Sequence, residues 1–227
     1  MNSLRTIPPT IFETFPRAAA SITRASIPTS NPATTSPLRQ FRSTPAAMSQ
    51  PSFQQYKIES TTFPSAPGVN LNDAQKVITG SVLDLFAGRP SLRKLQLWKD
   101  DAAFVDPLTI AEGRKQYAAQ WYGLKAAFSQ IERLGGQVVA DGNPIELDMK
   151  TRYVVKGIGK EQTIASKVKI WTEGEGANMR IKRVEDRWDD QLPDSTFKNA
   201  LRHLNSVIVP TLVSVPKSIE EEEAGQK

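Results

Sequence analysis

Apolar residues recur at helical spacing in the first clearly patterned part of the chain. Asn70-Leu-Asn72-Asp73 supplies side chains that cap helices, and the apolar positions after it follow helical spacing. These positions are Val77, Ile78, Val82, Leu85 and Phe86. Gly88 fits just beyond the end of this helix. Ser91 is the predicted cap of a second, short helix. The apolar residues of that short helix are Leu92, Leu95 and Trp98.

A third helix is predicted from Ile110 to Ala127, because Tyr117, Trp121 and Leu124 are spaced by four and then three residues. After this helix the apolar period changes to two, which indicates strands. The predicted strands are Gln137–Ala140, Ile145–Val155, Gln162–Thr172 and Met179–Trp188, with a turn at Asp141–Pro144 and a hairpin loop at Glu173–Gly176. Further along, Thr196–Val209 has the pattern of an added amphipathic helix.

Helices followed by an antiparallel meander predict an α+β domain. We expect its sheet to be strongly bent and to close over the first helix, which would leave one central cavity. The domain should cover residues 70–216 and follow a linker or strap at residues 49–69, which are rich in Pro, Ser and Gln. Residues 217–227, with their run of glutamates, should form a solvated, disordered tail.

Composition excludes several kinds of site. The chain has 227 residues and no cysteine, so disulfides, thiolate nucleophiles and cysteine-bound metals are excluded. His203 is the single histidine, which excludes a metal site built from several histidines. No apolar run approaches the roughly 18 residues that span a bilayer. Gly157-Ile-Gly159 is too short for a phosphate-binding loop, and we expect no cofactor and no metal.

The positive charge of the chain is concentrated near its start. Residues 1–48 contain five arginines, no lysine and one glutamate, a local charge of +4 that leaves +1 for the remainder of a chain whose total is +5. Nucleic acid is therefore not an expected partner of the folded part. A segment rich in Arg, Ser, Thr, Pro and Ala and nearly free of acids is typical of a mitochondrial transit peptide. The alternative is a disordered tail without a targeting role.

One segment resembles a known processing motif. Arg39-Gln-Phe41-Arg-Ser-Thr44 has the spacing of arginine, bulky apolar residue and hydroxyl residue found in the two-step cleavage motif of matrix precursors. The resemblance implies a mature start near Ser49 and a location in the mitochondrial matrix. Plastid targeting is a weaker alternative, and Met48 offers an alternative start without the leader.

A second resemblance concerns the folded part. The segment Trp98–Pro107, which runs into Asp106-Pro107, and the following Gly113–Trp121 resemble the cone-shaped nuclear transport factor 2-like superfamily, which includes ketosteroid isomerases and SnoaL-like polyketide cyclases. The resemblance covers roughly residues 72–190. It implies that Asp106 stands at the position of the isomerases' proton-abstracting aspartate and that Trp188 matches their pocket tryptophan.

The isomerases also need hydrogen-bond donors for the developing enolate. Their tyrosine donor is replaced by Val82, and their protonated aspartate corresponds to Ser166 or Lys167. We therefore do not expect steroid isomerase activity. Relatives with an Asp/His pair would need a histidine in the pocket, but His203 lies on the predicted added helix.

The candidate site contains two carboxylates among aromatic side chains. Asp106 and Asp186 are the candidate acid and base, because burial and mutual repulsion can leave one of two carboxyls protonated. The candidate ligand-binding residues are Trp98, Tyr117, Trp121, Val184 and Trp188. In the alternative interpretation, Asp106 caps the third helix, Asp186 pairs with Arg183 or Arg152, and the tryptophans only pack in the core.

Two functional hypotheses follow. The first is a SnoaL-like domain that binds a small hydrophobic ligand in a pocket, with a lyase or isomerase type of step that uses Asp106 and Asp186. The second is a non-catalytic interaction or assembly module of the mitochondrial matrix, since the fold also resembles the membrane-proximal domain of the import-motor anchor and a related mitoribosomal protein. The resemblance implies a homodimer formed through the outer face of the sheet.

Overall fold

The first helix forms where the sequence predicts it. Helix α1 spans Asp73–Phe86, and the Asn72 side chain accepts a hydrogen bond from the Gln75 N–H while the Gln75 side chain accepts one from the Asn72 N–H. This reciprocal pair satisfies two N–H groups that the helix leaves open. Gly88, just beyond the helix, has a φ of 70°, a conformation that favours glycine. The predicted start and end of this helix are confirmed.

The structure is a computed structural model, and it describes residues 51–189, 195, 199 and 214–225. All of these belong to the compact unit Ala46–Lys227. The expected transit peptide lies outside the described residues, and so does the expected helix Thr196–Val209 apart from Asn199. No helix in the described part is long and apolar enough to cross a membrane.

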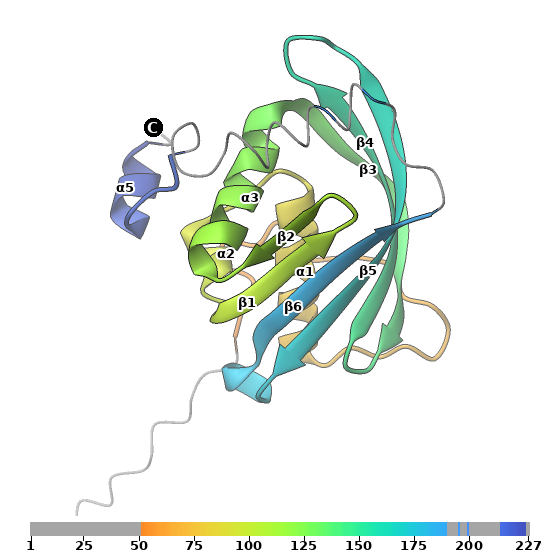
Figure 1. Ribbon diagram of the computed structural model, residues 1–227. Helices are drawn as coiled ribbons and strands as arrows, with labels where there is room; N and C mark the ends of the chain where they lie inside the picture. Colours follow the sequence, from red (N-terminus) through yellow and green to blue (C-terminus); the bar gives the residue numbers. More distant parts are fainter. Residues whose placement is uncertain (1–50, 190–194, 196–198, 200–213, 226–227) are drawn as a thin grey trace, which may run out of the picture. The chain divides into compact units, whose positions relative to one another are not determined.

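Six strands form one sheet in the order β2-β1-β6-β5-β4-β3. The strands are β1 (Trp98–Asp106), β2 (Thr109–Glu112), β3 (Phe128–Asp141), β4 (Ile145–Val155), β5 (Glu161–Glu173) and β6 (Arg180–Trp188). All neighbouring pairs are antiparallel except β1 and β6, which are parallel. Figure 1 shows the sheet bending, with α1 and α3 on the side toward which it bends. This arrangement confirms the α+β class and the bent sheet.

Several predicted boundaries are wrong. Helix α2 is only Leu92–Leu95, capped by Ser91 as expected, and Trp98 begins strand β1 instead of ending that helix. Helix α3 is Arg114–Ala127 and starts four residues later than predicted, because Thr109–Glu112 pairs with β1 as strand β2. Gly113, with a φ of 80°, separates that strand from the helix.

Strand β3 is also longer than the predicted Gln137–Ala140. It begins at Phe128, and most of the residues between Phe128 and Val138 are exposed. A stretch that is polar on both faces has no period of two in its apolar residues, so its sequence gives no strand signal. Its position is fixed by pairing with β4, from Phe128 opposite Val155 to Asp141 opposite Ile145.

Aromatic side chains from the helices and from β1 form the centre of the core. The Trp121 ring lies 5.1 Å from Phe86, 4.6 Å from Phe104 and 5.9 Å from Trp98, measured between ring centroids. Tyr117 packs against Trp98 at 4.9 Å. Such pairs contribute about 0.5–1.5 kcal/mol each beyond the burial of their area. The cluster therefore fixes α3 against α1 and the first strand.

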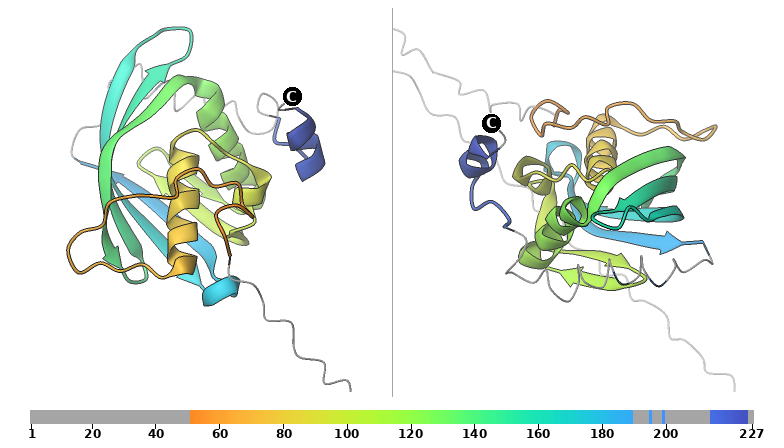
Figure 2. Two further views of the ribbon diagram at one scale, coloured as in Figure 1. Left: turned by 180° about the vertical axis from the view of Figure 1, so that it is seen from behind. Right: turned by 90° about the horizontal axis from the view of Figure 1, so that it is seen from above.

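The segment from residue 51 to residue 69 is a strap that lies on α1 (Figure 2). Tyr56 and Ile58 are buried in the core. The end of the strap pairs with β3, where Val138 N–H donates to the carbonyl of Pro64 and Ala66 N–H donates to the carbonyl of Val138. The strap therefore crosses the outside of α1 and joins the far edge of the sheet.

The fully buried carboxylate of Asp84 holds the strap to α1 and α2. It accepts hydrogen bonds from the N–H groups of Glu59 and Ser60 at 2.8 and 3.0 Å. Arg89 and Lys94 contact it at 2.7 and 3.1 Å. Burial alone would raise the pKa of Asp84, but the hydrogen bonds from Glu59 and Arg89, together with the charge of Lys94, outweigh burial and lower it.

The acidic C-terminal segment forms helix α5, Ile219–Ala224, instead of the solvated tail that its composition predicts. Glu222 is buried, accepts a hydrogen bond from the Leu92 N–H at 3.0 Å and is hydrogen-bonded to the Tyr122 hydroxyl. Glu223 pairs with Arg93 at 2.9 Å and with Lys57 at 2.7 Å. These contacts join α5 to α2, α3 and the strap, and sequence composition alone does not reveal them.

We predict that Gly80→Ala destabilises the fold by loosening the strap. A β-carbon at Gly80 would overlap the carbonyl oxygen of Ser60 and lie 3.0 Å from the side chains of Ile58 and Phe53. The expected loss in the free energy of unfolding is about 1–3 kcal/mol, measured by urea denaturation. Gly135→Ala is the control, because a β-carbon there meets nothing within 4 Å. Equal stability of the two variants would contradict close packing of the strap on α1.

Candidate active site

Asp106 ends strand β1 and turns its carboxylate toward the core. Its Oδ1 accepts a hydrogen bond from the Leu108 N–H at 2.7 Å, within the turn that leads into β2. Burial raises the pKa of Asp106 to about 6, although the hydrogen bond from Leu108 opposes this shift. The interpretation of Asp106 as the cap of the third helix is wrong, because Gly113 occupies that position and no side chain caps the helix there.

Asp186, on β6, is 6% exposed. Its Oδ2 accepts a hydrogen bond from the indole N–H of Trp188 at 2.8 Å, and its Oδ1 has no hydrogen-bond partner among the described residues. Burial raises the pKa of Asp186 to about 7, and the charge of Asp106 adds to this effect. The two carboxyls are therefore close enough to influence each other's ionisation.

Asp186 does not pair with either of the arginines proposed for it. Arg152 pairs with Glu132 at 2.6 Å and with Glu161 at 3.1 Å on the outer face of the sheet. Arg183 lies 4.0 Å from Glu185. The interpretation of Asp186 as half of an ion pair is therefore wrong. Within the described part of the chain, neither Asp186 nor Asp106 forms a salt bridge.

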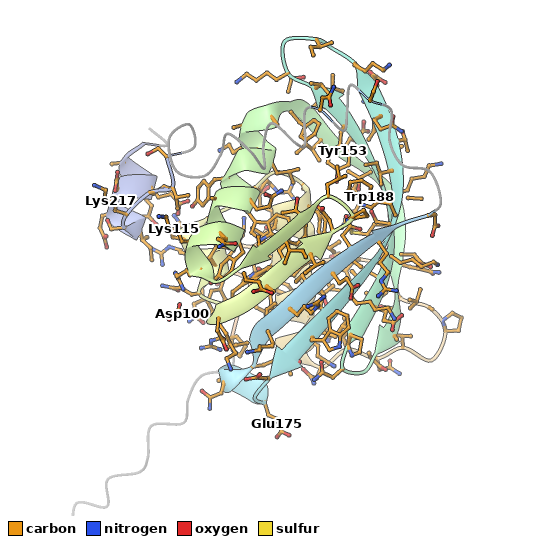
Figure 3. All side chains as sticks on the ribbon, in the orientation of Figure 1. Asp100, Lys115, Tyr153, Glu175, Trp188 and Lys217 are labelled. Carbon is orange, nitrogen blue, oxygen red and sulfur yellow. The ribbon has the colours of Figure 1, made fainter. Side chains whose placement is uncertain are left out.

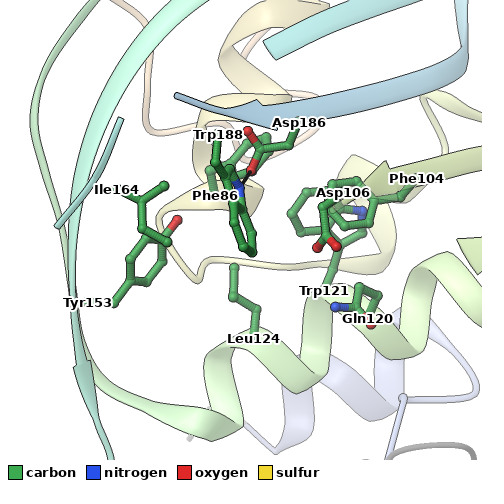
Figure 4. A pocket seen from close by; sticks show the side chains of 10 residues that line it. All are labelled: Phe86, Phe104, Asp106, Gln120, Trp121, Leu124, Tyr153, Ile164, Asp186 and Trp188. Carbon is green, nitrogen blue, oxygen red and sulfur yellow. Dashed lines mark hydrogen bonds between the residues drawn. The ribbon is translucent and has the colours of Figure 1, made fainter. Parts of the chain in front are cut away.

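The two carboxyls line one cavity, drawn in Figure 4. Its volume is about 30 Å³, enough for one or two water molecules. The lining residues are Phe86, Phe104, Asp106, Gln120, Trp121, Leu124, Tyr153, Ile164, Asp186 and Trp188. The Trp188 side chain extends across the cavity beside Asp186 (Figure 4). A ligand larger than water therefore requires a displacement of side chains.

The structure brings together four of the seven residues predicted for the site, namely Asp106, Trp121, Asp186 and Trp188. The other three do not line the cavity. Trp98 and Tyr117 pack against each other, and the Tyr117 hydroxyl donates to the carbonyl of Lys99 at 3.1 Å. Val184 is fully buried beneath the cavity on the same face of β6 as Asp186.

Gln120 and Tyr153 line the cavity but were not predicted to do so. Gln120 is 9% exposed, and its amide makes no hydrogen bond within the described residues. It lies three residues after Tyr117, on the apolar stripe of the helix. A polar residue among these apolar ones could have marked Gln120 as a residue of the site. Tyr153 lies in the predicted strand Ile145–Val155. The alternation of apolar residues there predicts a buried side chain but does not indicate a role in the site.

Two of the six buried side-chain polar atoms that lack a hydrogen-bond partner among the described residues belong to this cavity. The Trp121 indole N–H and Asp186 Oδ1 are buried without a hydrogen-bond partner among the described residues. A buried polar atom without a partner costs about 1–3 kcal/mol, so such atoms commonly mark a bound water or ligand. The cavity thus offers N–H donors from Trp121 and Gln120 beside two carboxyls. No group of three or more His, Cys, Asp or Glu side chains in the described residues could hold a metal ion.

The sequence matches no protein-family model and no curated protein. The structure is similar to a steroid delta-isomerase from Pseudomonas aeruginosa, with 16% identity, coverage of 60% of this chain and 92% of that chain, and a TM-score of 0.45. It is also similar to a nuclear transport factor 2-like superfamily protein from Salmonella enterica (18% identity, 52% and 92% coverage, TM-score 0.41). A third similar structure is a hexachlorocyclohexane dehydrochlorinase from Novosphingobium barchaimii (12% identity, 52% and 86% coverage, TM-score 0.41).

We predict that Asp186→Asn stabilises the protein at alkaline pH. The folded state holds a proton on Asp186 up to a pKa of about 7, whereas the unfolded chain releases it near 3.9. The folded state therefore binds more protons in this window, and its stability falls as the pH rises. The variant avoids this loss, so its free energy of unfolding at about pH 8 should exceed the wild-type value by about 2–4 kcal/mol.

The same comparison near pH 4 should show no gain, because both forms of the site are then neutral. Chemical denaturation at a series of pH values measures this difference. Asp148→Asn is the control, because Asp148 faces the opposite side of the sheet and contacts Lys167 at 3.4 Å. An equal effect of the two substitutions would show that Asp186 is not destabilised by burial.

Proposed function

We propose that the cavity binds a small, mainly apolar molecule and transfers a proton on it, in a lyase or isomerase type of reaction. The observation that supports this proposal is the pair of buried carboxyls, Asp106 and Asp186, which share one aromatic cavity without a compensating cation. A structural carboxylate at comparable depth in this protein, Asp84, contacts two cations. Uncompensated burial is costly, and such costs are common at functional sites.

The raised pKa values of Asp106 and Asp186 allow both groups to take part in proton transfer. Burial raises the pKa of Asp106 to about 6, so near neutral pH this group is mostly ionised and can accept a proton. Burial raises the pKa of Asp186 to about 7, so about half of its molecules carry a proton that can be donated. Both carboxyls can therefore exchange a proton near neutral pH. We assign the base to Asp106, whose Oδ1 accepts the Leu108 N–H, and the acid to Asp186, and the N–H groups of Trp121 and Gln120 bind a polar atom of the ligand.

The competing proposal is a non-catalytic interaction module. It is favoured by the small volume of the cavity, about 30 Å³, and by the dense aromatic packing around Trp121. In that case the tryptophans serve the core alone and the function depends on the protein surface. The two proposals make opposite predictions for proton transfer in the cavity.

Nitrobenzisoxazole is a suitable probe, because loss of its ring proton to a base opens the N–O bond and releases a coloured cyanonitrophenolate. We predict a saturable reaction that Asp106→Asn slows by about 100-fold or more. The rate should rise with pH through the pKa of Asp106, about 6. Asp148→Asn is the matched control on the outer face of the sheet and should leave the rate unchanged. Equal rates for both variants would exclude Asp106 as the base and favour the interaction module.

We further propose that the protein resides in the mitochondrial matrix, on the basis of the five arginines and single acid of residues 1–48. A fusion of residues 1–48 to a fluorescent protein should accumulate in mitochondria. Replacement of the five arginines by glutamine should abolish this import while leaving the length and apolar content of the segment unchanged. Uniform fluorescence of the cytosol from the unaltered fusion would contradict the proposal.

A homodimer through the outer face of the sheet also stays a prediction. That face carries ion pairs between neighbouring strands, including Glu146 with Lys169 at 2.8 Å and Asp148 with Lys167 at 3.4 Å. A dimer that uses this face would bury paired charges and would therefore be sensitive to salt.

A further inference from the structure

A much larger groove adjoins the carboxylate cavity. It has a volume of about 1300 Å³ and lies between α2, β2 and the first turns of α3 on one side and Ser214–Ile219 on the other. Gln120 lines both the groove and the carboxylate cavity. The only side chain common to the two spaces is thus an amide that makes no hydrogen bond within the described residues. Gln120 therefore lies between the groove and the cavity that holds Asp106 and Asp186.

The groove has an apolar floor. Its apolar lining residues include Leu92, Leu95, Leu108, Ala118, Ala119 and Val215. Ile110, at its edge, is 69% exposed, which is unusual for a large aliphatic side chain in a strand. Apolar surface of this kind gains free energy when an apolar molecule covers it.

Positive charge lines the same groove without any acidic side chain. Arg114, Lys115 and Lys217 are its charged lining residues. Arg114 pairs with Asp100 at 3.1 Å. Lys115 and Lys217 make no ion pair within the residues that the structure describes, and they come from opposite walls, one on α3 and the other on the segment leading into α5 (Figure 3). Two such lysines across an apolar groove are complementary to an anionic group attached to an apolar chain.

The wall that carries Lys217 depends on the docking of α5. Glu222 binds the Leu92 N–H and the Tyr122 hydroxyl, and Glu223 pairs with Arg93 and Lys57. Lys217 N–H itself donates to Glu221 at 2.8 Å, which ties the segment to the helix. The acidic helix α5 therefore completes the groove and positions one of its two lysines.

We propose that this groove binds an elongated apolar carboxylate of medium chain length, with its acid end between Lys115 and Lys217 and its other end at Gln120. The proposal deepens the proposed function by naming its ligand class. It rests on that function for the reaction in the carboxylate cavity beyond Gln120. Lys115 and Gln120 are five residues apart on α3, about 7.5 Å along the helix axis, which is the least length that the ligand must span. The groove volume of about 1300 Å³ leaves room for a chain of medium length. The opposite orientation is disfavoured, because it would place an anion beside two carboxyls.

Decanoate, with decanol as its uncharged analogue, tests the proposal on the full chain by isothermal titration calorimetry. We expect decanoate to bind one site with at least about tenfold higher affinity than decanol. The double substitution Lys115→Gln with Lys217→Gln should weaken decanoate binding about tenfold, and should leave decanol binding unchanged. A tenfold loss of decanoate affinity is the effect expected for the loss of two partly screened ion pairs.

Lys125→Gln is the matched control, because Lys125 lies on the same helix but does not line the groove. The proposal is overturned by equal affinity for decanoate and decanol, by an equal loss in the Lys125→Gln variant, or by the absence of saturable binding. The last result is expected if another part of the chain fills the groove.

A second arm tests the role of α5. Glu222→Gln with Glu223→Gln removes the charges that hold this helix, and should weaken decanoate binding by about the same factor as the loss of Lys217. Glu220→Gln is the control, since Glu220 forms no hydrogen bond or ion pair with α2, α3 or the strap among the described residues and the charge of Arg93 acts on it only at a distance. Unchanged affinity in the double variant would show that the wall does not depend on α5.

Failure of this proposal and failure of the proposed function are distinguishable. Asp106→Asn should abolish proton transfer to the nitrobenzisoxazole probe, but should change the affinity for decanoate by less than about twofold. Loss of decanoate binding with retained proton transfer would overturn the groove alone. Decanoate binding with no proton transfer in the unaltered chain would leave a ligand-binding groove beside an inert cavity.

Discussion

The buried carboxylate of Asp84 is the interaction on which the arrangement of the N-terminal half depends. It binds two strap N–H groups, Arg89 after α1, and Lys94 within α2. Each of these partners comes from a different part of the chain, so folding must bring all three segments together before the charge is compensated. Removing both cations would leave a buried charge uncompensated, which costs about 3–5 kcal/mol. The strap and both helices are therefore fixed relative to one another, and they form the frame against which α3 packs.

Comparison with Asp84 explains why Asp106 and Asp186 differ chemically from a structural carboxylate. All three are acids removed from water, but cations and backbone N–H groups lower the pKa of Asp84, whereas burial raises the pKa of Asp106 and Asp186. The difference arises from the neighbours. The side chains around the cavity are aromatic or aliphatic apart from Gln120, and none of them is cationic. A carboxyl in that setting exchanges its proton near neutral pH, which is the property that proton transfer requires.

Local patterns predicted the elements whose apolar residues repeat with a regular period. Helix α1 and strand β4 follow periods of 3.6 and 2, and both were predicted to within a few residues. The missed elements lack such a pattern: β2 has four residues, the first half of β3 is exposed on both faces, and α5 is acidic. Their positions depend on partners distant in the sequence, such as Leu92 for Glu222. The same limit applies to the site. Asp186 was predicted from its strand and Asp106 from the resemblance of its segment, but the contribution of Gln120 required the packing of α3.

The small cavity and the large groove have opposite physical characters, and Gln120 lies at their junction. The cavity holds unpaired polar atoms at a cost of about 1–3 kcal/mol each, yet it has room for little more than water. The groove has the room and the lysines that can orient an anionic ligand, but it has no acidic side chain. A molecule that lies along the groove and extends one polar atom past Gln120 would satisfy the donors of Trp121 and Gln120 and place its reactive end beside Asp106. The free energy gained along the apolar groove would then offset the displacement of side chains in the cavity.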